Sequence, residues 1–258
     1  MDRRTYLRSL GVAGVAATAG CLDGVAGMLD DGSADGAILG PPEVDLSAAS
    51  HPSYGDDVPS FTLPDPLLEE EISPERFVGE RAFLLTFIYT NCHDDSCPML
   101  LSRLVHAQQA AAEAGLEDEI ALLAMTFDPE RDTEDVLREE AEIVGADLEA
   151  GNWHFLRPES YDEAETVLAE QFGLQLDHHG LDDDDHEHDH DDDHGHDDDH
   201  GHDDDHGHGN EADEYDIVHY NLILLVNRDG IVERAYPNAA SVEWSVITDD
   251  LLTVVEDG

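Results

Sequence analysis

The sequence predicts an α/β domain in which helices flank a central mixed sheet. Two nearly continuous apolar runs, residues 81–89 and 120–127, are typical of strands buried on both faces. Apolar residues at helical spacing follow each run. Two cysteines, Cys92 and Cys97, stand where the first buried strand meets its helix. The element order β-α-β-α-β-α-β-β-α, with a cysteine pair at this junction, describes a thioredoxin-like fold.

The remaining elements follow from local patterns. Helices are expected at residues 99–114, 133–144, 160–172 and 242–255. Strands are expected at residues 153–156, 218–227 and 231–236. Thr133 has the side chain and the position of a helix N-cap. The tripeptide Arg228-Asp229-Gly230 supplies a hairpin turn between the last two strands.

The charge of the chain excludes some classes of partner. Its 258 residues include 63 acidic residues and 11 basic ones, all arginine, which gives a net charge of −52. A nucleic-acid binder needs Lys and Arg to neutralise phosphates, so this class is excluded, and attraction to an anionic membrane surface is not expected. At molar salt the Debye length is about 3 Å, which screens the self-repulsion. The composition therefore indicates a protein of a high-salt environment.

The N-terminus predicts export. Arg3-Arg4 precedes a short apolar stretch, residues 10–19, which is too short to cross a bilayer and is typical of a twin-arginine signal. Thr18-Ala19-Gly20-Cys21 resembles a lipobox, in which Cys21 would be lipidated; otherwise Cys21 is an ordinary residue of a cleaved signal peptide. We expect the protein at the outer face of the cytoplasmic membrane, anchored by the lipid.

Composition also predicts the domain boundaries. Residues 1–21 form the lipoprotein-type signal, and residues 22–57, rich in Gly, Ala and Asp without an apolar period, are expected to be a flexible acidic tether. Residues 58–258 form the folded domain. An insertion rich in His and Asp, residues 177–212, interrupts it.

The cysteine pair indicates thiol chemistry. A helix N-terminus lowers the pKa of a thiol, which makes Cys92 and Cys97 candidate nucleophiles or soft-metal ligands. A structural disulfide is the alternative in an oxidising compartment, and two unrelated buried thiols are a further one.

Four sequence blocks carry a resemblance to a known family. They are TFIYTNC with the later CP, MTFDPERDT, NWHFL, and VHY with the later LVNRDG, within residues 86–98, 125–133, 152–156 and 218–230. In this order they resemble the SCO/SenC family of copper-handling proteins, which assist cytochrome oxidase assembly. The acidic composition indicates a haloarchaeal type of that family.

The resemblance implies a copper site. By position, the copper ligands are Cys92, Cys97 and His219; two thiolates with one imidazole suit Cu(I) and can also hold Cu(II). Without the resemblance, a lone histidine on a strand would be read as structural. It also implies a partner, the copper-bearing subunit of cytochrome c oxidase or another acceptor of copper or thiols. The family spaces its cysteines by three residues, whereas four separate them here, including His93 and Asp94.

Residues close to this motif leave alternatives open. His93 and Asp94 could be accessory ligands or part of a solvated acidic loop. Asp128 and Asp132 with Arg131 could form a functional carboxylate site, or they could fix the loop and cap the following helix, with Arg131 pairing locally. No catalysis is assigned to them.

The insertion is a second candidate metal site. Residues 177–209 hold eleven histidines and sixteen acids, and residues 191–208 are three copies of Asp-Asp-Asp-His-Gly-His. Imidazole binds Zn²⁺, Cu²⁺ and Ni²⁺, and His-x-His pairs chelate locally. The candidate accessory ligands are His186, His188, His190, His194, His196, His200, His202, His206 and His208. The insertion is either an antenna that collects metal or an expanded, solvated, dispensable loop.

Three functions are therefore open. The first is a membrane-anchored copper metallochaperone. The second is a thiol–disulfide oxidoreductase in which Cys92 attacks and Cys97 resolves, and the third is a metal buffer that acts through the insertion. His219 separates the first two, because thiol exchange needs only the cysteines, whereas copper capture needs all three residues.

Overall fold

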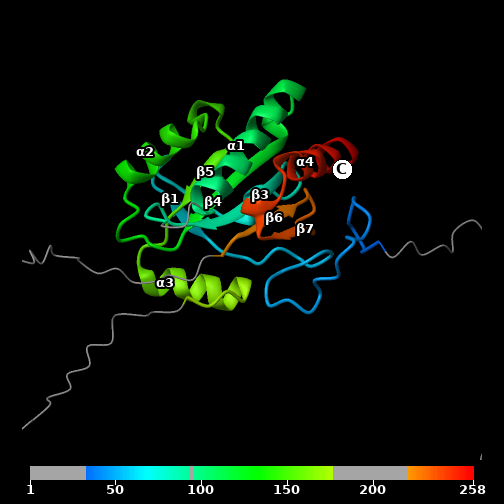
Figure 1. Ribbon diagram of the computed structural model, residues 1–258, viewed down its shortest axis with the longest axis horizontal. Helices are drawn as coiled ribbons and strands as arrows, with labels where there is room; N and C mark the ends of the chain where they lie inside the picture. Colours follow the sequence, from blue (N-terminus) through cyan, green and yellow to red (C-terminus); the bar gives the residue numbers. More distant parts are fainter. Residues whose placement is uncertain (1–32, 93–95, 177–219) are drawn as a thin grey trace, which may run out of the picture. The chain divides into compact units, whose positions relative to one another are not determined.

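A five-stranded mixed sheet is the centre of the structure, a computed structural model that describes residues 33–92, 96–176 and 220–258 (Figure 1). The strands are β3 (Ala82–Ile88), β4 (Ile120–Thr126), β5 (Trp153–Leu156), β6 (Leu222–Val226) and β7 (Val232–Pro237). Their order is β5-β4-β3-β6-β7; β4 runs parallel to β3 and β5, and β6 runs antiparallel to β3 and β7. The predicted mixed sheet of a thioredoxin-like fold is confirmed.

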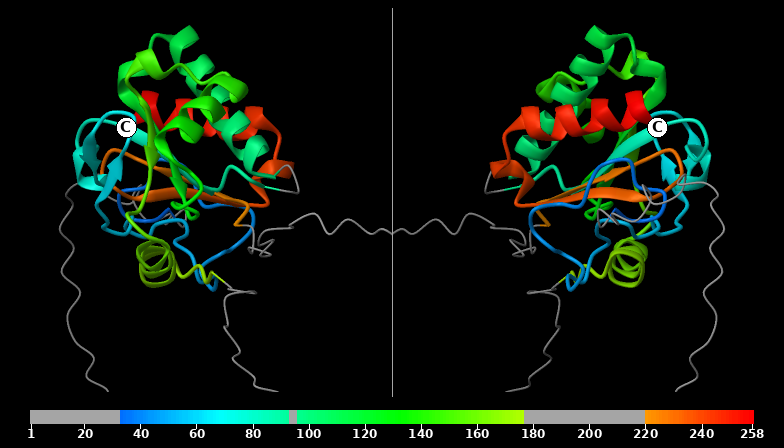
Figure 2. Two further views of the ribbon diagram at one scale, coloured as in Figure 1. Left: turned by 90° about the vertical axis from the view of Figure 1, so that its left-hand side faces the viewer. Right: turned by 90° about the vertical axis from the view of Figure 1, so that its right-hand side faces the viewer.

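Helices cover both faces of this sheet (Figures 1 and 2). One face carries α1 (Ser96–Ala114), α2 (Glu134–Val144) and α4 (Trp244–Asp257). The other carries α3 (Tyr161–Thr166), which continues into the π-helical turn η4 (Val167–Gln171). Short 3-10 turns complete the connections: η1 (Pro74–Arg76), η2 (Glu117–Glu119), η3 (Leu148–Ala150) and η5 (Ala239–Ser241). Within the described residues, every helix is too short or too polar to cross a membrane.

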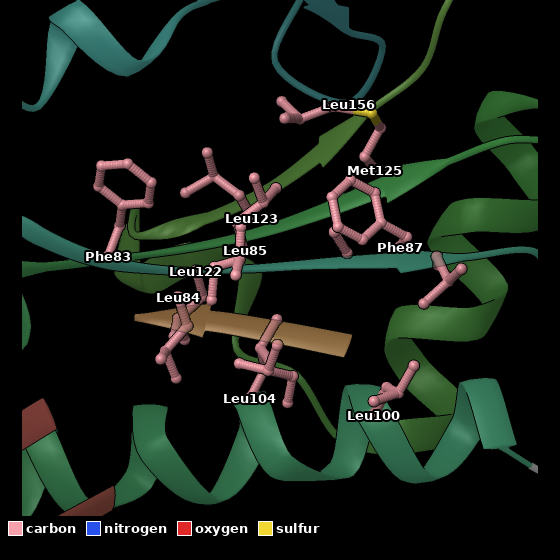
Figure 3. Packing of buried hydrophobic residues seen from close by; sticks show 14 of the residues in the cluster. Phe83, Leu84, Leu85, Phe87, Leu100, Leu104, Leu122, Leu123, Met125 and Leu156 are labelled. Carbon is pink, nitrogen blue, oxygen red and sulfur yellow. The ribbon is translucent and has the colours of Figure 1, made fainter. Parts of the chain in front are cut away.

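The strand that leads to the cysteines is buried on both faces. All seven residues of β3 are buried, as its continuous apolar run predicts. Figure 3 shows Leu84 on the side of α1, facing Leu100 and Leu104, while Phe83, Leu85 and Phe87 project from the opposite side. There the ring of Phe87 packs edge-on against Phe172, at a centroid distance of 4.9 Å. Burial on both faces fixes the position of the loop that follows β3.

Local details differ from the sequence expectation. A two-stranded hairpin, β1 (Leu63–Asp65) with β2 (Glu70–Ile72), was not expected, because three-residue strands are too short to show an alternating pattern. Thr133 is the N-cap residue of α2, but its side chain makes no capping hydrogen bond. The expected hairpin after Asn227 is present, with Gly230 at a φ of 81°.

The N-terminal segment, residues 33–57, differs most from expectation. Its composition predicts a flexible tether, whereas it packs against β7 and against Gly173, just after η4 (Figure 1). The buried carboxylate of Glu233 accepts hydrogen bonds from the backbone N–H groups of Ile38 (2.7 Å) and Leu39 (2.9 Å). The segment also exchanges backbone hydrogen bonds with Val232. Backbone bonding to a carboxylate and to an edge strand needs no apolar period, so composition did not reveal it.

Replacing Glu233 with glutamine is expected to loosen this segment. A glutamine amide has one acceptor oxygen, while the carboxylate also accepts a 2.6 Å hydrogen bond from Asn227 Nδ2, so at least one buried donor would lose its partner. The expected loss is about 1–3 kcal/mol in the free energy of unfolding, with faster proteolysis within residues 33–57. Urea unfolding and limited proteolysis measure both. Glu256→Gln on the exposed side of α4 is the control, and equal stability of the two variants would contradict the prediction.

Candidate metal and redox centre

The two cysteines lie at the carboxyl end of β3. Cys92 is half-buried in the loop after the strand, and Cys97 is buried in the first turn of α1. The two cysteines are not joined by a disulfide bond in this structure. Pro98 follows within the same turn, where its missing N–H costs the helix no hydrogen bond. The strand, the loop and the helix thus bring together the two residues that the sequence predicts as a pair.

The environment makes the two thiols unequal. The backbone N–H of Cys97 donates to Cys92 Sγ (3.3 Å), and Ser96 Oγ lies 3.4 Å from the same sulfur. The pKa of Cys97 is strongly raised, first because its thiol hydrogen-bonds to Cys92 and then because it is buried. A backbone hydrogen bond with Tyr89 opposes this shift. Burial and the hydrogen bond to Cys92 thus favour the protonated thiol of Cys97, whereas Cys92 is half-exposed and its sulfur accepts a hydrogen bond from the first turn of α1.

A buried carboxylate fastens the loop that carries Cys92. Asp132 accepts hydrogen bonds from the backbone N–H of Thr90 (3.2 Å) and from the hydroxyls of Thr90 and Thr126. Its own backbone carbonyl accepts a 2.9 Å bond from Arg157 Nε. Asp132 thus joins the end of β4 to the residue two positions before Cys92. The sequence leaves two interpretations of Asp128 and Asp132 open, a functional carboxylate site or a structural role in the loop. The structure agrees with the structural role, although Asp132 holds the cysteine loop rather than capping α2.

Three acidic side chains, Asp132 and two of its neighbours, have raised pKa values. Burial raises the pKa of Asp132, while hydrogen bonds from the two threonines oppose the shift. Burial also raises the pKa of Asp128, and its partner Arg131, 3.6 Å away, lowers it. The pKa of Glu140 on α2 is raised by burial and then by the charges of Asp132 and Cys92. The Coulombic contribution to Glu140 is a repulsion from Asp132 and Cys92, which a cation bound at Cys92 would reduce.

Glu140 was not identified from the sequence. It is one of several acids on the amphipathic helix α2, and nothing in its spacing distinguishes it from the exposed Glu139. Only the packing of α2 near the cysteine loop does so. Asp132 gave a partial signal, since it lies in a motif-like block directly after a buried strand.

The start of β6 lies at the same end of the sheet. The ring of Tyr220 packs edge-on against Phe127 (6.4 Å), and Phe127 packs against Tyr89 (5.2 Å), three residues before Cys92. The hydroxyl of Thr86 donates a 2.8 Å hydrogen bond to the carbonyl of Leu222, which joins β3 to the start of β6. Tyr220 and Leu222 therefore lie at the end of the sheet that carries the cysteine loop.

Several predicted site residues lie outside the described residues. They are Cys21, His93, His219 and the histidines of the insertion, His186, His188, His190, His194, His196, His200, His202, His206 and His208. Within the described ranges, no group of three His, Cys, Asp or Glu side chains could hold a metal ion. The described part of the centre thus supplies two thiols, with the carboxyl groups of Asp132 and Glu140 nearby.

Comparison with solved structures identifies the fold. A SCO1/SenC family lipoprotein from Bacillus anthracis str. Ames aligns with a TM-score of 0.55 at 16% identity, over 77% of this chain and 94% of that chain. BsSco, a member of the Sco family of cytochrome c oxidase assembly proteins, aligns at 0.54 and 20% identity, over 80% and 96%. Yeast Sco1 with copper bound aligns at 0.53 and 16% identity, over 80% and 91%.

Sequence comparison defines the family. No curated protein shows significant similarity to the chain. The family model described as SCO1/SenC matches residues 55–193, more than half of the chain, and its range contains both cysteines and the Asp132 network. The chain therefore belongs to the SCO1/SenC family.

Proposed function

We propose that this protein is an exported copper chaperone for cytochrome c oxidase assembly, anchored at the outer face of the membrane by a lipid on Cys21. Copper is its cargo, held by Cys92, Cys97 and His219. The acceptor is the copper-bearing subunit of the oxidase.

One observation carries the proposal: Cys92 and Cys97 are hydrogen-bonded to each other at the first turn of α1, in a chain of the SCO1/SenC family. A solved relative of this fold, yeast Sco1, has copper bound. Two adjacent thiols are soft ligands that suit Cu(I), and the half-buried Cys92 leaves one side open for transfer. A cation there would also reduce the repulsion between Glu140 and Cys92.

A third ligand is needed to complete this site. Asp132 is committed to Thr90 and Thr126, so it is not available as a ligand in this arrangement. His219 directly precedes Tyr220, whose ring packs near the cysteine loop. The position of His219 next to Tyr220 in the sequence supports its assignment as the third ligand.

Replacing His219 with alanine tests the ligand set. Tight copper binding is expected to be lost, while the cysteines still reduce a disulfide substrate, because thiol exchange does not use the imidazole. Copper titration with a competing chelator and a disulfide-reduction assay measure the two activities. His51→Ala, in which a histidine bonded to the Pro52 carbonyl is removed, is the control. Full retention of copper by the His219 variant would overturn the assignment.

Thiol–disulfide exchange is the second candidate function, and the hydrogen bond between the cysteines favours it. The Cys92 thiolate would attack a disulfide of the acceptor, forming a mixed disulfide and releasing one acceptor thiolate. Cys97 would then give up its proton and displace the second acceptor thiolate as the Cys92–Cys97 disulfide forms. The acceptor gains two electrons, and the cysteine pair loses two.

For the insertion we propose a metal-collecting role, with copper, zinc or nickel as its metals. Its composition supports this, because His-x-His pairs chelate these ions. Deleting residues 177–209 is expected to lower the metal stoichiometry measured by calorimetric titration, without affecting the tight cysteine site. If the deletion binds as much metal as the full chain, both the antenna and the metal-buffer function are excluded.

A further inference from the structure

A small polar cavity lies at a distance from the cysteine pair. Its volume is about 150 Å³, and its lining residues are Arg76, Phe77, Glu80, Arg81, Gly151 and His154. A water molecule takes up about 30 Å³, so the cavity has room for about five waters or for one small polyatomic ion. Arg81 immediately precedes β3, whereas Cys92 follows it, and the seven residues of this strand span about 23 Å. The cavity is therefore separate from the candidate metal and redox centre.

One wall of the cavity is a histidine with an unpaired nitrogen. His154 is 3% exposed, and its Nδ1 lies 3.3 Å from Oδ2 of the buried Asp65. A carboxylate only accepts hydrogen bonds, so Nδ1 carries the proton and donates it to Asp65. The other ring nitrogen, Nε2, is buried and has no hydrogen-bond partner among the described residues. A buried polar atom without a partner costs about 1–3 kcal/mol, a cost that a ligand in the cavity would remove.

The imidazole is held in this orientation by its neighbours. The ring of Phe77 packs against it at a centroid distance of 5.6 Å. Asp65 is itself fixed, because its Oδ1 accepts a 2.9 Å hydrogen bond from the backbone of Leu67. In the sheet His154 pairs with Leu123, which Figure 3 shows on the face opposite α1. The position of Nε2 is thus set before any ligand arrives.

Two guanidinium groups supply the positive charge of the cavity. Arg81 Nη1 donates to the Gly151 carbonyl (3.3 Å), and Arg76 Nη1 donates to Glu70 (2.7 Å). A guanidinium has five N–H donors, so each keeps donors beyond the one used here. The described residues contain eight arginines, and two of them line this one small cavity. In a chain of net charge −52, the cavity thus gathers two of the few cations, of which Arg76 is paired with Glu70.

We propose that the cavity binds a small protonated oxyanion of the phosphate class. Arg76 and Arg81 donate hydrogen bonds to its oxygens, as guanidinium groups do to phosphate. Its P–OH group donates to the lone pair of His154 Nε2, a buried nitrogen that has no hydrogen-bond partner among the described residues. Glu80, the only acid in the lining, opposes the anion and limits its affinity.

Calorimetric titration of the full chain with inorganic phosphate, at constant potassium chloride, tests the proposal. One saturable site is expected. Arg81→Gln is expected to weaken binding at least tenfold, and Glu80→Gln to tighten it several-fold. Arg138→Gln, which removes the same charge from an exposed ion pair with Glu134 on α2, is expected to bind phosphate as the unmodified chain does. His154→Gln is expected to weaken binding, and the two surface variants keep the test decisive if that buried substitution disturbs folding.

A parallel titration with glycerol 3-phosphate identifies the source of the phosphate group. Tighter binding of the ester would indicate a phosphomonoester ligand, and tighter binding of inorganic phosphate would indicate the free ion; both support the site. The proposal is overturned if phosphate shows no saturable binding, or if Arg81→Gln binds it as tightly as Arg138→Gln does.

Discussion

Replacing both Cys92 and Cys97 with serine is expected to abolish tight Cu(I) binding. Serine hydroxyls are hard, neutral donors, whereas the thiolates are the soft ligands that select this ion. We expect the affinity to fall by more than about a hundredfold, beyond the 10–100-fold that changes outside the ligand set cost. Copper titration under reducing conditions, with a competing Cu(I) chelator, measures the change.

The third cysteine provides the matched control for this experiment. Cys21→Ser changes the one cysteine that is not a proposed copper ligand and is expected to leave copper affinity unchanged. If the double variant retained the affinity of the unmodified chain, the cargo site would have to lie elsewhere, with the histidine-rich insertion as the first candidate. Loss of the remaining copper binding when residues 177–209 are deleted from the double variant would then identify the insertion as the cargo site.

Replacing Phe87 with alanine is expected to cause a large loss of stability. Phe87 is 1% exposed and packs against Phe172, and Figure 3 shows it among the residues on the face of the sheet opposite α1. Truncating a fully buried phenylalanine removes its apolar surface from the core and leaves a cavity, which costs about 3–5 kcal/mol. Urea unfolding at fixed salt measures the free energy.

Ile143→Ala is the control for the Phe87 variant. Ile143 lies on α2 with 70% of its surface exposed, so its truncation is expected to change stability by less than about 0.5 kcal/mol. A loss below about 1 kcal/mol for Phe87→Ala would mean that the packing of Phe87 against Phe172 contributes little to the fold. Nearly equal free energies of unfolding for Phe87→Ala and Ile143→Ala would contradict the prediction.

The core elements were predictable because burial on both faces leaves a strong sequence signal. The apolar run that became β3, the run that became β4, and the short piece Trp153–Leu156 all appeared as expected. The cysteines were also predictable, since Cys92 and Cys97 stand at a strand–helix junction that the sequence marks on its own. Two short strands and the packed N-terminal segment were missed, because backbone hydrogen bonds hold them and leave little apolar pattern.

The surroundings of the cysteines were only partly predictable. Asp132 was recognised as one of a carboxylate pair, but its partners Thr90 and Thr126 lie 42 and 6 residues away along the chain. Glu140 carried no signal at all. Polar contacts of this kind depend on where separate elements meet, and single-sequence patterns report only local periodicity.

The sequence by itself determined the α/β architecture, the cysteine pair and the acidic character of the chain, because these depend on local composition and spacing. Only the tertiary structure decided that Asp132 fastens the cysteine loop and that Glu233 holds residues 33–57 in place. It alone brought His154 beside Arg76 and Arg81. The physical reason is the same in each case: a buried polar group must find its partners in space, and the fold sets which distant residues those partners are.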